Sequence, residues 1–176
     1  MVVLQIAGYK NSGKTTLASA VVRRLSSRGC RIGTIKHDAH EFEPDVPGTD
    51  SWKHREAGAY ATAITSKTRT AWTLERPTPL DELLGEMRSH ALDAVIVEGF
   101  KDAPYPKVVL LRDEADADLL NLPNIVAAAL RQRNDRLEEA VRAANLPSYC
   151  IEDAHLDDLL DSLDAWVASA ITRATN

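Results

Sequence analysis

The chain has 176 residues, a length that suits one domain with its own core, and its apolar (44%) and charged (27%) fractions are those of an ordinary soluble globular protein. Its formal net charge of −5 argues against a general nucleic-acid-binding surface, and no apolar run is long enough to span a bilayer. The first residues form a strand pattern and not a signal peptide. Cys30 and Cys150 lie far apart and look like small buried hydrophobic residues, so we expect a cytoplasmic protein.

The N-terminal stretch predicts a phosphate-binding loop. An apolar run over 2–7, typical of a buried strand, leads into Gly8-Tyr9-Lys10-Asn11-Ser12-Gly13-Lys14-Thr15, which matches G-x-x-x-x-G-K-[ST], and a helix over 14–27 follows. The glycines let backbone N–H groups point at phosphate oxygens. In such loops the lysine reaches the β- and γ-phosphates, and the hydroxyl that follows it ligates Mg²⁺. The predicted nucleotide-binding residues are Gly8, Lys10, Asn11, Ser12, Gly13, Lys14, Thr15 and Thr16.

The next elements are a strand over 30–35 and a long polar segment over 36–54. So short a strand–helix–strand unit implies a right-handed crossover and parallel pairing of its two strands. The polar segment follows the carboxyl end of the second strand, which is the ligand side of an open parallel sheet. A short helix over 50–57, with Asp50 as its N-cap, ends this segment.

The rest of the chain alternates between predicted strands and helices. Two short strands over 60–65 and 69–74 are joined tightly by 66–68, and Thr78 starts a helix whose buried side includes Leu84. Further strands are expected over 94–97, 107–111, 125–130 and 148–151, and further helices over 134–144 and 156–171. This order predicts a single α/β domain over 1–176, with a mostly parallel sheet covered by helices on both faces and a small antiparallel extension.

Acidic residues at two strand ends predict a magnesium site. Glu98 follows the apolar run over 94–97, where phosphate-loop proteins place an acid near the metal. Gly99 would let the backbone pass close to a γ-phosphate. Asp38, just past the second strand, can face the same ion. The predicted metal residues are therefore Thr15, Asp38 and Glu98.

Other polar residues leave several interpretations open. His37, His40 and His54 could form a metal cluster, although His-x-x-His without cysteines is a weak zinc signal. Basic residues could surround a polyphosphate or an anionic substrate, and these are Lys10, Lys36, Lys101 and Arg112. A guanine-reading Asn-Lys-x-Asp is absent, and the Asn134-Asp135 pair fits a helix cap better than a purine contact.

Several motifs together resemble the molybdopterin-guanine dinucleotide biosynthesis adapter family, MobB. They are the loop from Gly8 to Thr16, Ile35–His40, Pro47–Ser51, Glu56–Ala59, Val97–Lys101, Lys107–Leu110 and Arg112-Asp113. The resemblance implies a dimeric GTP-binding protein with weak intrinsic GTPase activity that assists the guanylyltransferase joining GMP to molybdopterin. It carries phosphate and magnesium roles onto Gly13, Lys14, Thr15, Thr16, Asp38 and Glu98. One departure is Thr49, where the family usually has lysine before Asp-Ser.

The leading hypothesis is thus a cytoplasmic GTP-binding adapter in molybdenum cofactor maturation that uses Mg²⁺ and forms a homodimer through edge strands near 69–74. The residues expected to contact a substrate or partner are Lys36, His37, His40, Asp50 and Lys101. Two alternatives use the same scaffold. One is an ATP-dependent small-molecule kinase or carboxylate-activating ligase, and the other is a metallochaperone GTPase that uses His37 and His40.

Overall fold

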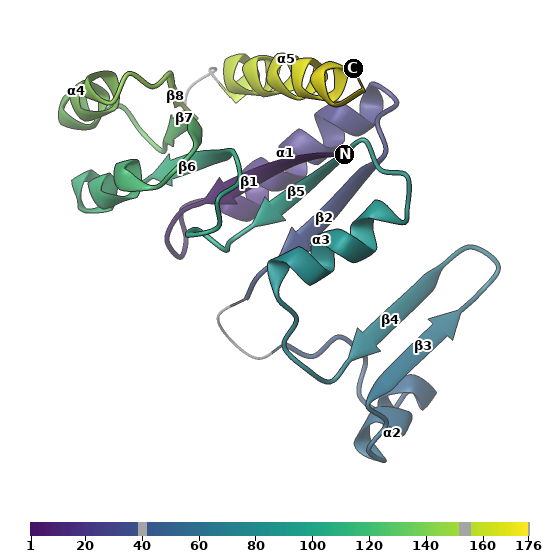
Figure 1. Cartoon of the computed structure of the whole chain (residues 1–176). Helices are drawn as coiled ribbons and strands as arrows, with labels where there is room; N and C mark the ends of the chain where they lie inside the picture. The colour runs from purple at the N-terminus through teal and green to yellow at the C-terminus, as the bar shows by residue number, and fades with distance from the viewer. Residues whose placement is uncertain (39–41, 152–155, 176) are drawn as a thin grey trace. The chain divides into compact units, whose positions relative to one another are not determined.

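The computed structural model describes residues 1–38, 42–151 and 156–175, and the chain forms two compact units (Figure 1). The first unit comprises Met1–His37 and Leu83–Asn176, and the second comprises Asp38–Glu82. Each is described by itself below. None of the helices in the described ranges is both long and apolar enough to cross a membrane.

The first unit is built on a six-stranded sheet of order β2-β5-β1-β6-β7-β8, in which all neighbouring strands are parallel. The strands are β1 (Val2–Ala7), β2 (Ile32–Lys36), β5 (Ala94–Glu98), β6 (Lys107–Leu111), β7 (Ile125–Leu130) and β8 (Ser148–Cys150). The predicted strands are confirmed, with small differences at their ends. The expected pairing of the first two strands is wrong, because β5 lies between β1 and β2 and pairs with both.

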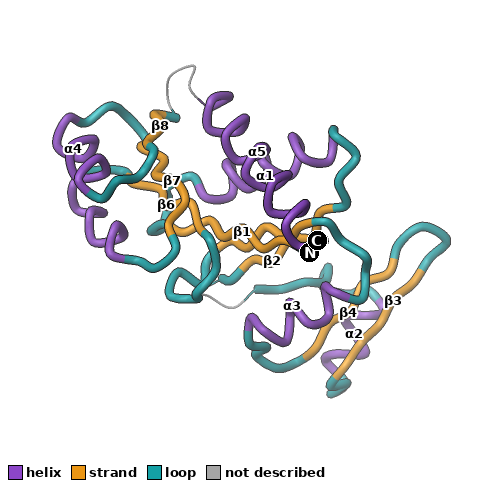
Figure 2. Tube along the Cα trace, turned by 45° about the horizontal axis from the view of Figure 1, so that its top comes forward, coloured by secondary structure: helices purple, strands orange, loops and turns teal. Residues whose placement is uncertain are grey.

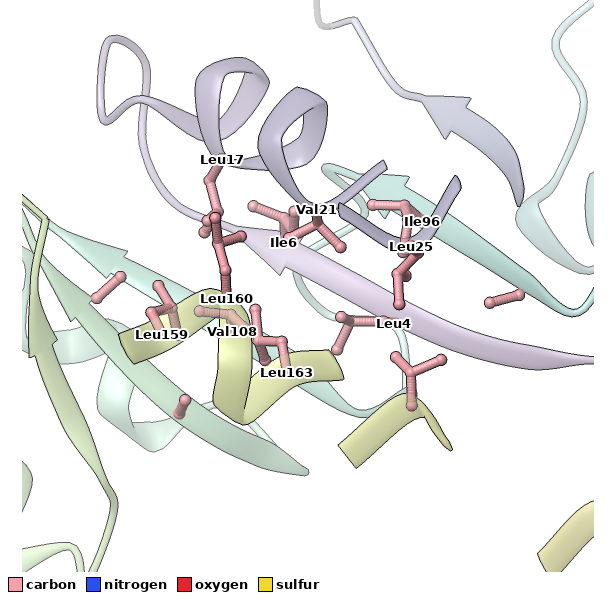
Figure 3. Close-up of a cluster of buried hydrophobic side chains, with 14 of the residues drawn as sticks. Leu4, Ile6, Leu17, Val21, Leu25, Ile96, Val108, Leu159, Leu160 and Leu163 are labelled. Atoms are coloured by element: carbon pink, nitrogen blue, oxygen red, sulfur yellow. The ribbon is translucent and has the colours of Figure 1, made fainter. Parts of the chain in front are cut away.

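Two helices cover one face of this sheet, α1 (Lys14–Ser27) and α5 (Leu156–Thr175), and Figure 2 shows them together on the same side. In α1, Leu17, Val21 and Leu25 recur every four residues and are buried. Figure 3 shows these side chains meeting Leu4 and Ile6 of β1 and leucines of α5. Each fully buried leucine or isoleucine stabilises the fold by about 1.5–3 kcal/mol relative to an exposed one.

The opposite face packs against shorter elements. These are the C-terminal part of α3 (Leu80–Arg88), the 3₁₀ helix η1 (Glu114–Asn121) and α4 (Asp135–Ala143). Asn134 caps α4, as predicted, by accepting a hydrogen bond from the Leu137 amide (3.1 Å). The sequence analysis missed η1. Its eight residues are held by the buried Leu119 and by Asp113, whose carboxylate accepts from the Ala115 amide (2.9 Å).

The second unit contains α2 (Asp50–Glu56) and an antiparallel hairpin of β3 (Ala61–Thr65) and β4 (Thr70–Leu74). Both strands were predicted. Asp50 is not the N-cap of α2, because Thr49 takes that position: its amide and hydroxyl both donate to the Val46 carbonyl, at 3.2 and 2.8 Å, which turns the chain one residue earlier.

The cysteines are half-buried, and not buried as predicted. Cys30 follows α1 and packs at the margin of the main core, while Cys150 ends β8 at the edge of the sheet. A side chain at such a margin keeps part of its surface in solvent, which sequence alone does not reveal.

Candidate functional site

The loop Gly8–Thr15 connects β1 to α1 and has the shape of an anion-binding site. Asn11 (φ 62°) and Gly13 (φ 93°) adopt left-handed conformations, and the Ser12 amide donates to the Tyr9 carbonyl at 3.2 Å. Gly13 precedes α1 without a capping side chain. The first amides of α1 lack intrahelical acceptors, so they can bind a phosphate at the positive end of the helix dipole.

Gly8 is required by close packing. A Cβ at this position would lie 2.6 Å from Ser12 Oγ and 3.2 Å from both the Cβ and the carbonyl oxygen of Leu110. Ser12 itself is buried, and its hydroxyl has no hydrogen-bond partner among the residues described. The loop therefore fits tightly against β6 and leaves a buried hydroxyl beside the amides that are predicted to bind phosphate.

The Lys14 side chain folds over the loop, where its Nζ donates to the Tyr9 carbonyl at 2.7 Å. Partial burial lowers the pKa of Lys14. The nearby Glu98 carboxylate opposes this shift, while the positive charges of Lys36 and Arg112 add to it. A cation among cations favours an anionic ligand, because such a ligand relieves their mutual repulsion.

Thr15 and Glu98, 83 residues apart in sequence, meet as the sequence analysis expected. The Thr15 hydroxyl donates to both carboxylate oxygens of Glu98, at 2.8 and 3.0 Å. Glu98 ends β5 beside Ile6 of β1 and is 8% exposed. A hydroxyl next to a buried carboxylate offers the hard oxygen donors that Mg²⁺ prefers, so the pair fits a magnesium site.

The residues at the end of β2 lie beside Glu98. Lys36 is the register partner of Glu98, and the His37 amide donates to the Glu98 carbonyl at 2.9 Å. Gly99 has φ 93°, and a Cβ there would lie 3.0 Å from the Cβ of His37. The left-handed backbone and the close approach of His37 together favour glycine at this position, independently of any phosphate.

The Arg112 guanidinium is not available to bind a polyphosphate, because its hydrogen bonds support the loop. Its guanidinium donates to the buried Asp116 at 2.8 and 2.7 Å and to the Lys10 carbonyl at 3.0 Å. The Arg112 hydrogen bonds hold the pKa of Asp116 below its ordinary value. Sequence reasoning missed this interaction because Asp116 lies in the unpredicted η1; the spacing of four residues was the available signal.

Tyr9 links the loop to two neighbouring segments. Its hydroxyl donates to Asp118 at 2.5 Å, and this hydrogen bond raises the pKa of Tyr9. Lys101 Nζ lies 5.2 Å and the Arg112 guanidinium 5.7 Å from the centroid of its ring, within the range of cation–π contacts. Lys101 Nζ thus lies beside Tyr9 of the loop, and its predicted contact with a substrate or partner stays a prediction.

Three of the predicted site residues, Asp38, His40 and Asp50, belong to the second unit or lie outside the described residues. Asp38 and Asp50 belong to the second unit, where Asp50 is exposed and pairs with Lys53 at 3.1 Å. His40 lies outside the described residues. Over the described ranges, the structure gathers no group of three or more histidine, cysteine or acidic side chains that could hold a metal ion.

A pocket of about 280 Å³ lies beside the loop in the first unit. Its walls come from the loop, the start of α1, the ends of β7 and β8 and the start of α5: Asn11, Ser12, Gly13, Thr16, Leu17, Arg131, Ile151 and Leu156. Such a mixture of apolar and polar walls suits the nucleoside part of a nucleotide whose phosphates lie on the loop.

Comparison with known proteins gives a consistent result. A family model described as molybdopterin guanine dinucleotide synthesis protein B matches residues 3–131. A probable molybdopterin-guanine dinucleotide biosynthesis adapter protein of Bacillus subtilis is 34% identical over 153 residues, which cover 86% of each chain. Solved structures agree in fold: a MobB homologue from Bacillus stearothermophilus has a TM-score of 0.69 at 31% identity over 98% of this chain and 99% of that one. Bacillus subtilis MobB has a TM-score of 0.74 at 30% identity over 92% and 97%.

The matched region includes the phosphate loop, Glu98 and Lys101, and the fold agrees over nearly the full chain. The prediction of a mostly parallel phosphate-loop sheet with an antiparallel extension is confirmed. The chain belongs to the molybdopterin guanine dinucleotide synthesis protein B (MobB) family.

Proposed function

We propose that this protein is a cytoplasmic GTP-binding adapter in molybdopterin-guanine dinucleotide biosynthesis, which assists the guanylyltransferase that forms the dinucleotide. Relatives that are 34–41% identical carry the name of molybdopterin-guanine dinucleotide biosynthesis adapter proteins. The observation that carries the proposal is the contact between the Thr15 hydroxyl and the buried Glu98 carboxylate, next to the phosphate loop.

The loop amides and Lys14 would hold the phosphates, while Thr15 and Glu98 would hold Mg²⁺, with Asp38 as a further proposed ligand. When bound, Mg²⁺ neutralises the charge of the β- and γ-phosphate oxygens. Lys14 would exchange its hydrogen bond with the neutral Tyr9 carbonyl (2.7 Å) for hydrogen bonds with phosphate oxygens, in which both partners are charged.

Hydrolysis should be slow. Arg112, the arginine bound to the loop at Lys10, is committed to Asp116 by two side-chain hydrogen bonds. An arginine held in this way does not stabilise charge on a transferring phosphoryl group, and phosphate-loop proteins without such a group turn over slowly. We therefore propose an adapter that presents a nucleotide-dependent surface to its partner, with Lys36, His37, His40, Asp50 and Lys101 as candidate contacts.

The experiment that tests the proposal captures the protein on an immobilised molybdenum cofactor guanylyltransferase, with Mg²⁺ and GTP, GDP, ATP or no nucleotide. We expect GTP to increase capture several-fold over ATP and over no nucleotide. Glu98→Gln should remove the GTP-dependent part, because an amide is a weaker magnesium ligand than a carboxylate. Glu139→Gln, an exposed change on α4, is the matched control.

Two results would contradict the proposal. Preferential binding of ATP, together with rapid phosphate release that depends on a small acid or amine, would favour the kinase or ligase alternative. Equal capture with every nucleotide and with none would show that GTP has no part in binding of the adapter to its partner.

The proposal includes a homodimer formed through the β3–β4 hairpin. Both strands of this two-stranded sheet are edge strands, and they carry exposed apolar side chains at Ile64, Trp72 and Leu74. Trp72 is 74% exposed and lies on the same side of β4 as Leu74, two residues along the strand. We expect light scattering to give the mass of a dimer and Trp72→Lys to shift it toward a monomer. A wild-type monomer at micromolar concentration would contradict this part of the proposal.

A further inference from the structure

The connection between β5 and β6, residues 99–106, contains no helix. The register explains why it can be so short: β1 pairs Ile6 with Glu98 and Gln5 with Lys107, so β6 begins almost level with the end of β5. A non-helical connection leaves its carbonyl groups without intrahelical donors, and buried carbonyls need other partners. In the structure, buried side chains of β1 and β6 donate hydrogen bonds to these carbonyls.

Gln5 of β1 is one donor. It is fully buried, and its Nε2 donates to the carbonyls of Gly99 (2.7 Å) and Phe100. Its Oε1 is buried without a hydrogen-bond partner in the part of the chain that the structure describes. A glutamine in the middle of a buried strand that leaves one atom unpaired is costly to the fold, which indicates a task beyond packing.

Lys107 of β6, beside Gln5 in the register, is the other donor. It is fully buried, and its Nζ donates to the carbonyls of Lys101 (3.1 Å) and Ala103 (2.6 Å). Burial lowers the pKa of Lys107, and the charge of Asp102 opposes that shift. A buried ammonium group is expensive, and stability alone rarely accounts for one.

The segment held in this way carries groups that reach the nucleotide site. Gly99 and Phe100 both have positive φ, at 93° and 49°, and the second value is unfavourable for a residue with a Cβ. The Phe100 ring contacts the His37 ring at 4.6 Å between centroids, and Lys101 Nζ lies 5.2 Å from the Tyr9 ring centroid. The hydrogen bonds from Gln5 and Lys107 therefore hold the segment in a strained conformation, and this conformation places Phe100 beside His37 and Lys101 beside Tyr9.

We propose that Gln5 and Lys107 are positioning residues for the γ-phosphate end of the nucleotide site. By holding the four carbonyls of residues 99–101 and 103, they fix the segment that follows Glu98 and places Lys101 at the loop. The site then distinguishes a nucleoside triphosphate from a diphosphate. This inference rests on the proposed nucleotide binding, and it adds that the distinction depends on two side chains that touch no nucleotide.

The test compares wild type with Lys107→Met and Gln5→Met, in which an apolar thioether of similar length replaces each donor. Val109→Ala is the matched control, because Val109 is fully buried two residues along the same strand. For each protein, calorimetry measures the dissociation constants of Mg·GTP and Mg·GDP, and thermal unfolding measures stability. Hydrogen exchange measures the protection of the amides over 99–103.

We expect Lys107→Met and Gln5→Met to bind Mg·GTP about tenfold more weakly, to bind Mg·GDP within about twofold of wild type, and to exchange faster over 99–103. Val109→Ala should lower the unfolding temperature and leave the GTP-to-GDP affinity ratio unchanged. A purely structural role of Gln5 and Lys107 predicts a different result. Both methionine variants would then unfold at lower temperature and keep the GTP-to-GDP affinity ratio of wild type.

The failures are separable. If wild type binds neither nucleotide, the proposed function and this inference both fail. If wild type binds both nucleotides and the methionine variants keep its affinity ratio, only this inference is overturned. Should Lys107→Met not fold, Gln5→Met decides the question, since it removes two hydrogen bonds and no charge.

Discussion

Replacing Lys14 by methionine should weaken Mg·GTP binding by about 100-fold, which corresponds to ~2.7 kcal/mol. The length of the side chain is kept, so the change removes the ammonium charge and its hydrogen bonds. Lys14 already reaches back to the Tyr9 carbonyl at 2.7 Å, so its ammonium lies against the loop that would hold the phosphates. Partial burial makes its charge costly without a partner, so an anion should gain strongly from it.

Isothermal calorimetry on the variant and on Lys67→Met measures this effect. Lys67 lies at the exposed tip of the β3–β4 hairpin, so its loss should leave the affinity within about twofold. Burial of the Lys14 ammonium carries a desolvation cost, which its lowered pKa reflects, and methionine carries no such cost. The free energy of unfolding of Lys14→Met should therefore not fall. Unchanged GTP affinity in this variant would overturn the assignment of the loop as the nucleotide site.

Gly8→Ala should both destabilise the protein, by about 1–3 kcal/mol, and abolish measurable nucleotide binding. The added Cβ would lie 2.6 Å from Ser12 Oγ and 3.2 Å from the Leu110 carbonyl oxygen, a backbone atom of β6 that cannot rotate away. Relief of these contacts requires the loop to move away from the sheet. The amides that would bind phosphate move with it, so a single methyl group affects stability and binding together.

Chemical unfolding and calorimetry check this prediction, and a double variant sharpens it. Gly8→Ala/Ser12→Ala removes the shortest contact and should recover part of the stability. Gly85→Ala is the control, because a Cβ there meets nothing within 4 Å and alanine favours a helix over glycine by about 0.5–1 kcal/mol. If Gly8→Ala kept full stability and affinity, close packing would not be the reason for glycine at this position.

Much of the candidate site follows from short-range patterns. The sequence predicted α1 with the observed bounds, since helical spacing and flanking glycines act over a few residues. It predicted the hairpin from two short strands and a three-residue connection. It also placed Glu98 near Thr15, because any acid at the carboxyl end of a strand next to β1 comes close to the phosphate loop.

The long-range partners could not be predicted in this way. The pairing of β5 between β1 and β2 depends on which strands become neighbours, and alternation of apolar residues is the same in every order. For the same reason, no sequence pattern indicated that Gln5 and Lys107, which are far apart in the chain, are neighbours in the sheet. Nor did any pattern indicate that Arg112 donates to the Lys10 carbonyl.

By itself, then, the sequence determined the phosphate loop, its helix, the acid that meets Thr15 and the α/β class, because each depends on backbone preferences and spacing within one or two elements. Only the tertiary structure decided the strand order, the reason for glycine at 8 and 99, and the buried donors beneath residues 99–103. These features are contacts between segments distant in the chain, and their energies exist only once the sheet has brought the segments together.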